Sequence, residues 1–310
     1  MASSVLYRSA NPWWIFFPRL SHRNLLTQCT VVLQRSERLG HVFSATTSTA
    51  AAADHERCGR RFRRGKSDNL KGSCCADTFV VASDEKYGDK QVISVTPRLY
   101  DYLLTNVREP EILRELREET ATMRGSQMQV SPDQAQLLAM LVQILGAERC
   151  IEVGVYTGYS SLAIALVLPE SGHLVACEKD ASSLEVAKRY YDRAGVLHKV
   201  DVKHGLAADA LKSMIQRGEV DSYDFAFVDA EKRMYQEYFE LLLQLSPMQV
   251  RIGGVIVIDN ILWHGKVADP QVNDSKTISI RNFNRNLMGD KRVSISMVPI
   301  GDGMTICRKR

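Results

Sequence analysis

The stretch at residues 151–160, IEVGVYTGYS, constrains the fold of this chain more than any other. Apolar residues on either side of Glu152 stop at Gly154, which indicates a buried strand ending in a tight loop, and Gly158 then opens a helix. Glycine lets a ligand approach the backbone, and the free N–H groups at the start of a helix can face an anionic group. The spacing is E-x-G-x-x-x-G, which differs from the G-x-G-x-x-G pattern of dinucleotide-binding folds. The stretch therefore predicts a parallel α/β sheet with a ligand beyond this strand.

Three later apolar segments, LVAC, YDFAFV and GGVIVI, are each followed directly by an acidic residue. Because ligands of open parallel sheets bind beyond the carboxyl ends of the strands, we expect these acids to converge on one cleft. The strand-end acids are Glu152, Glu178, Asp229 and Asp259. Four carboxylates repel one another unless cations or hydrogen-bond donors share the site. The sulfonium and ribose of S-adenosylmethionine, together with a divalent metal, would supply those partners.

The remaining pattern alternates helix and strand, as βαβ units do. Ser131, Pro132 and Gln134 form a capping box that predicts a helix through residue 145. Two amphipathic helices are expected before it, over residues 100–107 and 109–122. The expected strands are 150–153, 173–177, 199–203, 224–228 and 255–258, followed by an antiparallel hairpin of 292–298 and 304–308.

Five motifs carry a resemblance to a known family: EVGVYTGYS, AGVLHKVDVKHG, FVDAEK, the IDN segment followed by LWHG, and PIGDGMTICR. Over residues 99–310 the chain resembles the cation-dependent O-methyltransferases, and most closely the plant caffeoyl-CoA O-methyltransferase-like branch. Catechol O-methyltransferase is a more distant relative. The resemblance implies a Rossmann-like class I S-adenosylmethionine methyltransferase of the α/β class, with a mostly parallel seven-stranded sheet and a C-terminal antiparallel hairpin.

The resemblance also implies a set of cofactor-binding residues. Glu178 corresponds to the residue that holds the ribose, Ala207 lies beside the adenine and Glu231 lies near the methionine moiety. Val130 stands where the family usually has threonine, so only its backbone is expected to make contact. The complete implied set for S-adenosylmethionine is Val130, Glu152, Gly154, Val155, Ser160, Glu178, Ala207 and Glu231.

Asp229, Asp259 and Asn260 are the candidate metal ligands, because two carboxylates and an amide oxygen are hard donors suited to Mg²⁺. Taken singly, such strand-end residues often cap the following helix instead. Lys232 matches the lysine that in the family takes the phenol proton, which makes Lys232 and Asp229 the candidate catalytic residues. Without the family context, Lys232 would be interpreted as an exposed helix lysine.

The substrate side departs from the family pattern. Asp229, Trp263 and His264 are the expected substrate contacts, and His264 replaces the usual asparagine. Gln91, Thr277 and Ser279 stand near the positions where members acting on acyl-CoA have lysine, arginine and tyrosine, although Lys90 is adjacent to the first. We therefore expect the acceptor to be a vicinal-dihydroxy phenolic, either a phenylpropanoid or a flavonoid.

Charge and composition separate residues 1–76 from the rest. That segment has 12 Lys and Arg against 4 Asp and Glu, a net charge of +8, while the remainder has 28 against 32. Its first 53 residues contain a single acid, Glu37, and many Ser and Thr, which is typical of a transit peptide. We expect a disordered transit peptide and linker at 1–76, a single methyltransferase domain at 77–310, and a chloroplast location, with the mitochondrion or, if 1–76 does not target, the cytoplasm as alternatives.

Partners and competing functions follow from the same features. The mildly acidic remainder has no basic stripe, so no nucleic-acid partner is expected, and no apolar run approaches the ~20 residues of a membrane span. The family resemblance suggests a homodimer. Two alternatives to the methyltransferase are an NAD-linked oxidoreductase, which the missing G-x-G-x-x-G disfavours, and a catalytically inactive binding protein with the same fold.

Overall fold

The structure is a computed structural model that describes residues 78–80, 88, 91–217, 223–243 and 250–310. The described residues all belong to one compact unit. The expected transit peptide at 1–76 lies outside the described residues, and so does Lys90. Among the helices that the structure describes, none has the length and apolar character that a bilayer span requires.

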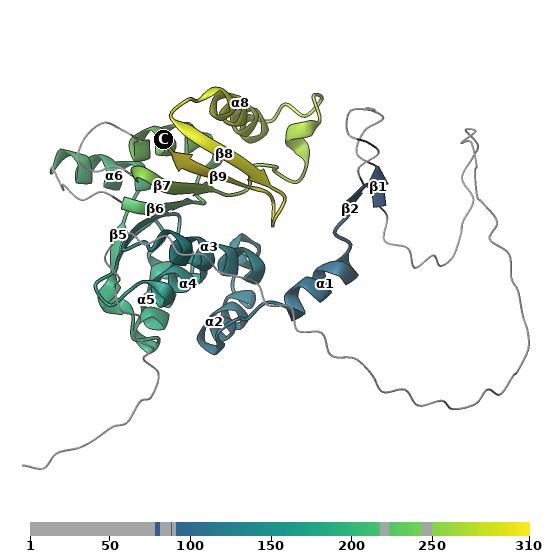
Figure 1. Ribbon diagram of the computed structural model, residues 1–310. Helices are drawn as coiled ribbons and strands as arrows, with labels where there is room; N and C mark the ends of the chain where they lie inside the picture. The colour runs from purple at the N-terminus through teal and green to yellow at the C-terminus, as the bar shows by residue number, and fades with distance from the viewer. Residues whose placement is uncertain (1–77, 81–87, 89–90, 218–222, 244–249) are drawn as a thin grey trace, which may run out of the picture. The chain divides into compact units, whose positions relative to one another are not determined.

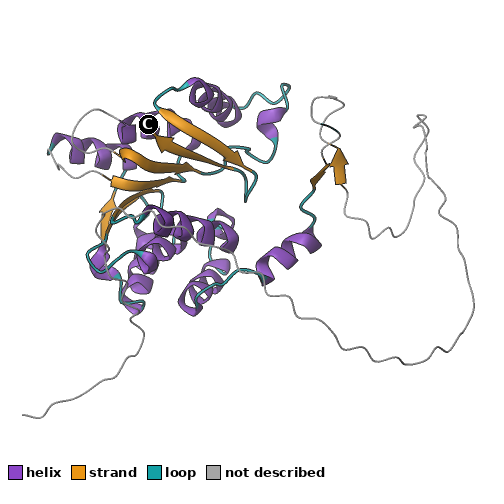
Figure 2. Cartoon of the chain, in the orientation of Figure 1, coloured by secondary structure: helices purple, strands orange, loops and turns teal. Residues whose placement is uncertain are grey.

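A seven-stranded sheet forms the centre of the unit, in the order β5-β4-β3-β6-β7-β9-β8 (Figures 1 and 2). Neighbouring strands from β5 to β7 pair parallel, whereas β9 pairs antiparallel with both β7 and β8. This confirms the predicted fold class and the C-terminal hairpin. The strands are β3 (Arg149–Val153), β4 (His173–Glu178), β5 (Val200–His204), β6 (Tyr223–Val228), β7 (Val250–Ile258), β8 (Val293–Val298) and β9 (Met304–Lys309).

Helices cover both faces of this sheet (Figure 1). They are α2 (Glu111–Ala121), α3 (Pro132–Leu145), α4 (Tyr159–Val167), α5 (Ala181–Arg193), α6 (Ala207–Gln216), α7 (Tyr235–Leu243) and α8 (Ser275–Gly289). Helix α1 (Pro97–Thr105) precedes them and contains no buried residue. Short 3₁₀ turns are η2 (Ser126–Met128), η3 (Leu197–Lys199), η4 (Lys232–Met234) and η5 (Lys266–Ala268). Ahead of α1, β1 (Thr78–Val80) pairs antiparallel with β2 (Gln91–Ile93).

The core is divided between the two faces because successive side chains of a strand point to opposite sides. On β3, Cys150 packs with α2, α3, α4 and α5, whereas Ile151 and Val153 pack with α6, α7 and α8. Both faces of the central strands are therefore buried, which explains why their sequences are nearly continuous apolar runs. The buried Glu152 is the exception within β3, and it belongs to the site described below.

The capping box predicted at the start of α3 is present: Ser131 is the N-cap, and the Gln134 side chain accepts a hydrogen bond from the Ser131 N–H at 3.1 Å. Helix α1 begins at Pro97, three residues before the start that the sequence predicted. Thr96 caps this helix through Oγ1, which accepts from the Leu99 N–H at 3.3 Å, and Pro97 occupies its first turn. A proline that follows a capping residue favours helix initiation, so the sequence contained this signal.

Candidate active site

Backbone hydrogen bonds between neighbouring strand ends bring the predicted loops together. Gly154 donates to a β4 carbonyl at 2.9 Å, Asp229 donates to a β3 carbonyl at 2.8 Å, and Asp259 donates to a β6 carbonyl at 3.0 Å. These residues follow the ends of β3, β6 and β7, which are adjacent in the sheet. The strand-end acids are thus gathered at one edge of the sheet, as the sequence predicted.

Gly154 and Gly158 are both in the left-handed region, with φ of 92° and 89°. A Cβ on Gly154 would lie 2.0 Å from the carbonyl oxygen of Asp229, and one on Gly158 would lie 2.8 Å from Ala187 Cβ. The sequence interpretation assigned these glycines to the approach of a ligand. The structure gives a different reason, because it is the close approach of the chain itself that excludes a side chain at both positions.

Glu152 is completely buried, and the Ser160 hydroxyl donates to its Oε1. Its Oε2 has no hydrogen-bond partner within the described residues. Burial raises the pKa of Glu152 to about 8, against the lowering effect of the Ser160 hydrogen bond, and the charges of Asp229 and Glu178 add to the rise. A buried carboxylate with an unpaired oxygen fits a ligand that brings a positive charge or hydrogen-bond donors.

Glu178, the predicted ribose-binding acid, is engaged by four backbone amides. Its Oε2 accepts from Val155 at 3.0 Å and Tyr156 at 2.9 Å, and its Oε1 accepts from Lys179 at 2.8 Å and Asp180 at 3.0 Å. The first two N–H groups belong to the loop after β3, so this carboxylate ties that loop to the end of β4. The anion that the loop amides face is therefore a side chain of the protein.

The other predicted cofactor residues lie on the same loops or at the nearby helix starts. Val130 immediately precedes the N-cap of α3 and Ala207 is the first residue of α6, and both are buried. Glu231 caps η4, and its Oε1 accepts from Arg233 Nε at 2.9 Å. Glu231 thus has a cationic partner within the protein.

Asp229 and Lys232 form an ion pair, with 2.6 Å between Lys232 Nζ and Asp229 Oδ1. Their side chains are only 16% and 11% exposed, so both are largely shielded from solvent. The Lys232 ammonium also lies 5.3 Å from the centre of the Tyr235 ring. Lys232 is therefore held at the strand end beside the candidate metal ligand, which contradicts the interpretation of an exposed helix lysine.

Asp259 is buried, and both hydrogen bonds to its carboxylate end on Oδ1. Gln134 Nε2 donates at 3.0 Å and the Asn260 N–H donates at 2.7 Å. Burial raises the pKa of Asp259 to about 8, and the charge of Asp229 adds to the rise. Two acids that repel each other, followed in the chain by Asn260, would fit a divalent cation because a positive charge relieves both the burial and the repulsion.

Asn260, the third candidate ligand, has an uncommon backbone conformation, with φ of 55°. Within the part of the chain that the structure describes, no group of three or more His, Cys, Asp and Glu side chains is placed to hold a metal. The candidate trio contains two acids and an amide, so it is a different kind of donor set. Its chemistry suits Mg²⁺, which is held in proteins by few carboxylates and keeps several waters.

The segment after Asn260 carries the predicted substrate contacts. Trp263 and His264 also have positive φ, of 48° and 54°, and their ring centres lie 5.2 Å apart. The His264 N–H donates to Asp302 Oδ1 at 2.6 Å, which fastens this segment to the β8–β9 turn. Lys276 Nζ lies 5.7 Å from the centre of the Trp263 ring, so a cation from α8 covers the predicted substrate contact.

Thr277 has a structural role. It is fully buried, and its N–H and hydroxyl donate to Asp274 at 3.0 and 2.6 Å, which caps α8. The structure therefore does not place its side chain among the substrate contacts. Ser279 is half-buried on the same helix, and the side chain of Gln91 is not described.

Three contributors to the site were not predicted from the sequence as site residues. Gln134 donates to the Asp259 side chain, and the Tyr235 hydroxyl donates to the Asp259 carbonyl at 2.9 Å. Asp302 accepts from the His264 N–H. Gln134 was recognised only as part of a capping box. Asp302 lies in the PIGDG motif, which could have identified it, whereas the pattern around Tyr235 gives no comparable signal.

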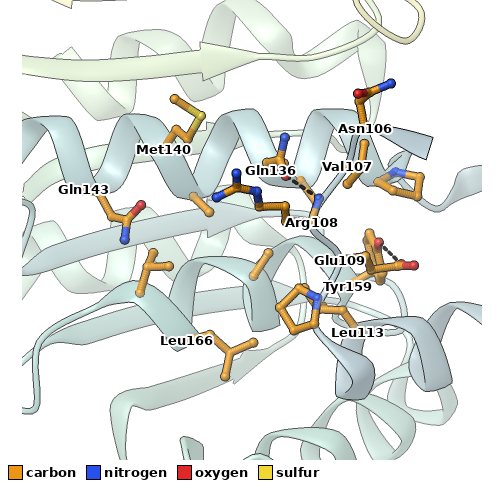
Figure 3. Close-up of a pocket in the computed structure, with 16 residues that line it drawn as sticks. Asn106, Val107, Arg108, Glu109, Leu113, Gln136, Met140, Gln143, Tyr159 and Leu166 are labelled. Atoms are coloured by element: carbon orange, nitrogen blue, oxygen red, sulfur yellow. Dashed lines mark hydrogen bonds between the residues drawn. The ribbon is translucent and has the colours of Figure 1, made fainter. Parts of the chain in front are cut away.

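A cavity of about 420 Å³ lies between α3, α4 and the segment that joins α1 to α2 (Figure 3). Arg108, Gln136 and Met140 are among the residues that line it, and none of the predicted site residues does. Gln134 is not among the lining residues, and its side chain contacts Asp259 instead.

The fold and the strand-end acids together define a class I methyltransferase. The family model described as O-methyltransferase matches residues 104–310, and the chain belongs to this O-methyltransferase family. It is 44% identical over 224 residues to tricin synthase 1 of Oryza sativa subsp. japonica, covering 68% of this chain and 87% of the relative. It is 39% identical over 235 residues to caffeoyl-CoA O-methyltransferase 2 of Petunia hybrida, covering 73% of this chain and 95% of that protein.

Solved structures agree with the sequence relatives. The O-methyltransferase TomG from Streptomyces achromogenes, in complex with S-adenosylmethionine, is 33% identical, with a TM-score of 0.59 over 66% of this chain and 91% of that chain. The O-methyltransferase from Bacillus cereus, in complex with S-adenosylhomocysteine, is 31% identical, with a TM-score of 0.62 over 68% and 97%. The protein is a methyltransferase that uses S-adenosylmethionine, and the oxidoreductase alternative is wrong.

Proposed function

We propose that the protein methylates a hydroxyl of a vicinal-dihydroxy phenolic, a phenylpropanoid or a flavonoid, with the help of a divalent cation such as Mg²⁺. The observation that carries this proposal is the buried Asp259 beside Asp229 and Asn260, a hard-oxygen donor set next to the cofactor loop. The names of the relatives, tricin synthase and caffeoyl-CoA O-methyltransferase, support an aromatic acceptor.

The cofactor would supply the methyl group as a sulfonium. We assign its binding to the loops after β3, β4, β5 and β6. Glu152 offers a buried, partly unpaired carboxylate, and Glu178 would share its oxygens between the loop amides and the ribose. Val130, Val155 and Ala207 are buried. Glu231 would have to exchange its contact with Arg233 for one with the cofactor.

A cation held by Asp229, Asp259 and Asn260 would supply Lewis acidity and orientation for two neighbouring phenolic oxygens. Lys232 is assigned as the residue that accepts the phenol proton at Nζ. Its Nζ donates a hydrogen bond to Asp229 Oδ1 at 2.6 Å, which holds it beside the candidate metal ligand.

The acceptor would lie against Trp263 and His264, with Lys276 above the indole ring. The flat aromatic ring of a phenolic acceptor can stack against the neighbouring rings of Trp263 and His264. Lys276 favours an acceptor with an anionic or electron-rich substituent. The capping role of Thr277 and the absence of arginine there support the view that a CoA tail contributes little. We expect kcat/KM for caffeoyl-CoA to be no more than about tenfold above that for a free catechol. Tenfold corresponds to ~1.4 kcal/mol, which is less than one good phosphate contact contributes.

Two further proposals concern the whole protein. We infer from the family resemblance that it is a homodimer, and the exposed apolar side chains of Tyr102, Met140 and Ile144 are candidates for the interface. We also propose that residues 1–76 direct the chain to the chloroplast, on the basis of their composition. A reporter fused after residue ~70 should enter chloroplasts, and retention in the cytosol would contradict this.

The function is tested by incubating the purified chain with methyl-labelled S-adenosylmethionine, Mg²⁺ and a panel of free and CoA-linked phenolics. A dihydroxyflavone should be methylated, and its matched monohydroxy analogue should not, because only the first offers two adjacent oxygens. Full turnover in excess chelator would refute the cation requirement, and equal turnover of the monohydroxy analogue would refute the acceptor class. Absence of turnover with every phenolic, despite cofactor binding, would favour the inactive binding protein.

A further inference from the structure

Gln134 is a buried side chain on α3 with both ends of its amide in use. Only 4% of it is exposed. Its Oε1 accepts from the Ser131 N–H at 3.1 Å and the Ser131 hydroxyl at 2.9 Å, and its Nε2 donates to Asp259 Oδ1 at 3.0 Å. The orientation of the amide is therefore fixed, because its carbonyl faces the helix cap and its amino group faces the carboxylate.

The β8–β9 turn holds this side chain in place from another side. A Cβ on Gly301 would lie 2.4 Å from Gln134 Cδ and Nε2, so the turn backbone packs directly against the amide. Gly301 has a φ of 56°, which favours glycine there for conformational reasons as well. Gln134 thus connects three segments that are distant in sequence: the start of α3, the end of β7 and the C-terminal hairpin.

The consequence for Asp259 is an asymmetric carboxylate. Oδ1 accepts from both Gln134 and the Asn260 N–H, whereas Oδ2 has no hydrogen-bond donor among the described residues. A carboxylate that is held through one oxygen presents the other in a defined direction. The Asn260 N–H belongs to the next residue of the chain, so the Gln134 amide is the side-chain contact that holds Asp259 from across the fold.

We propose that Gln134 is a positioning residue that fixes the Asp259 carboxylate and presents Oδ2 to the divalent cation. This rests on the cation-dependent function proposed above. Hydrogen-bond partners of metal-ligating carboxylates orient the ligand, and their loss typically weakens metal affinity about 10–100-fold. Gln134 also brings a donor without adding a charge, so it holds Asp259 without adding to the repulsion between Asp259 and Asp229.

The test compares Mn²⁺ binding to the full chain and to Gln134→Met, which keeps the length of the side chain and removes the donor. Isothermal titration with MnCl₂ should give a dissociation constant raised about tenfold, while the affinity for S-adenosylmethionine, measured separately, stays within about twofold. In the methylation assay, half-saturating Mg²⁺ should rise and kcat at saturating Mg²⁺ should be largely retained. A purely structural role would not produce this separation.

Gln136→Met is the matched control, because Gln136 is on the same helix, lines the cavity of Figure 3 and accepts from the Arg108 N–H at 2.8 Å. It should leave Mn²⁺ binding unchanged. If Gln134→Met does not fold, Gln134→Asn, whose amide is too short to reach Asp259, carries the same prediction. Absence of Mn²⁺ binding by the unaltered chain would refute the proposed cation site itself.

If the unaltered chain binds Mn²⁺ and both Gln134 variants bind it equally well, the inference is wrong and the proposed function stands. Loss of Mn²⁺ and cofactor affinity by the same factor would also overturn the inference, because it would show a general loss of structure at the start of α3.

Discussion

Glu152→Gln should change how the stability of the cofactor-free, metal-free protein depends on pH. Glu152 is completely buried, one of its oxygens is unpaired, and burial raises its pKa to about 8 from an ordinary value of 4.5. Between these two values the folded protein holds a proton that the unfolded chain has lost. Unfolding is then favoured by rising pH, so the free energy of unfolding should fall from about pH 4.5 to about pH 8 and level off above that.

The size of the effect follows from proton linkage. One proton held only by the folded state changes the free energy of unfolding by about 1.4 kcal/mol per pH unit. Glutamine has nearly the same shape and can still accept from the Ser160 hydroxyl, but it does not ionise. The stability of the unaltered protein minus that of Glu152→Gln should therefore fall by roughly 2–3 kcal/mol between pH 5.5 and 7.5.

Urea denaturation at several pH values, at constant ionic strength and with a chelator present, measures this difference. Asp259 has a similarly raised pKa, but it is present in both proteins, so its contribution cancels. The slope of the free energy of unfolding against urea concentration should be the same for both proteins, which checks that they expose the same surface on unfolding. Parallel stability profiles between pH 5.5 and 7.5 would refute the reasoning, because they would mean that Glu152 is already ionised in the folded protein.

Three other outcomes are expected. Gly154→Ala should lower the free energy of unfolding by about 2 kcal/mol or more in urea denaturation, because the new Cβ lies 2.0 Å from the Asp229 carbonyl and φ is 92°; an unchanged stability would mean that the loop can rearrange. Lys232→Met should lower kcat by about 100-fold or more while S-adenosylmethionine affinity stays within about twofold, as removal of a general base predicts, and an unchanged kcat would exclude that role. Glu178→Ala should weaken cofactor binding in a calorimetric titration by about 1.5–3 kcal/mol; an unaltered dissociation constant would place the ribose elsewhere.

Local patterns in the sequence were sufficient to predict most of the fold. Strand positions follow from apolar runs that stop at acids and glycines, and the start of α3 follows from its capping box. These signals act between residues that are neighbours in the chain, so they can be recognised without knowing the packing. The convergence of Glu152, Asp229 and Asp259 was also predictable, because parallel strands that are adjacent in a sheet end at the same edge.

The contacts that orient the site were decided by the tertiary structure. Gln134 and Asp259 are separated by 125 residues, and their hydrogen bond depends on how α3 packs over the ends of the strands. The need for glycine at position 154 likewise comes from the Asp229 backbone, which only the β3–β6 pairing brings near. The sequence by itself determined the fold class, the order of the elements and which acids lie together at the carboxyl ends of the parallel strands. Only the tertiary structure decided which carboxylate oxygens remain free for a ligand, because that depends on donors contributed by segments far away in the chain.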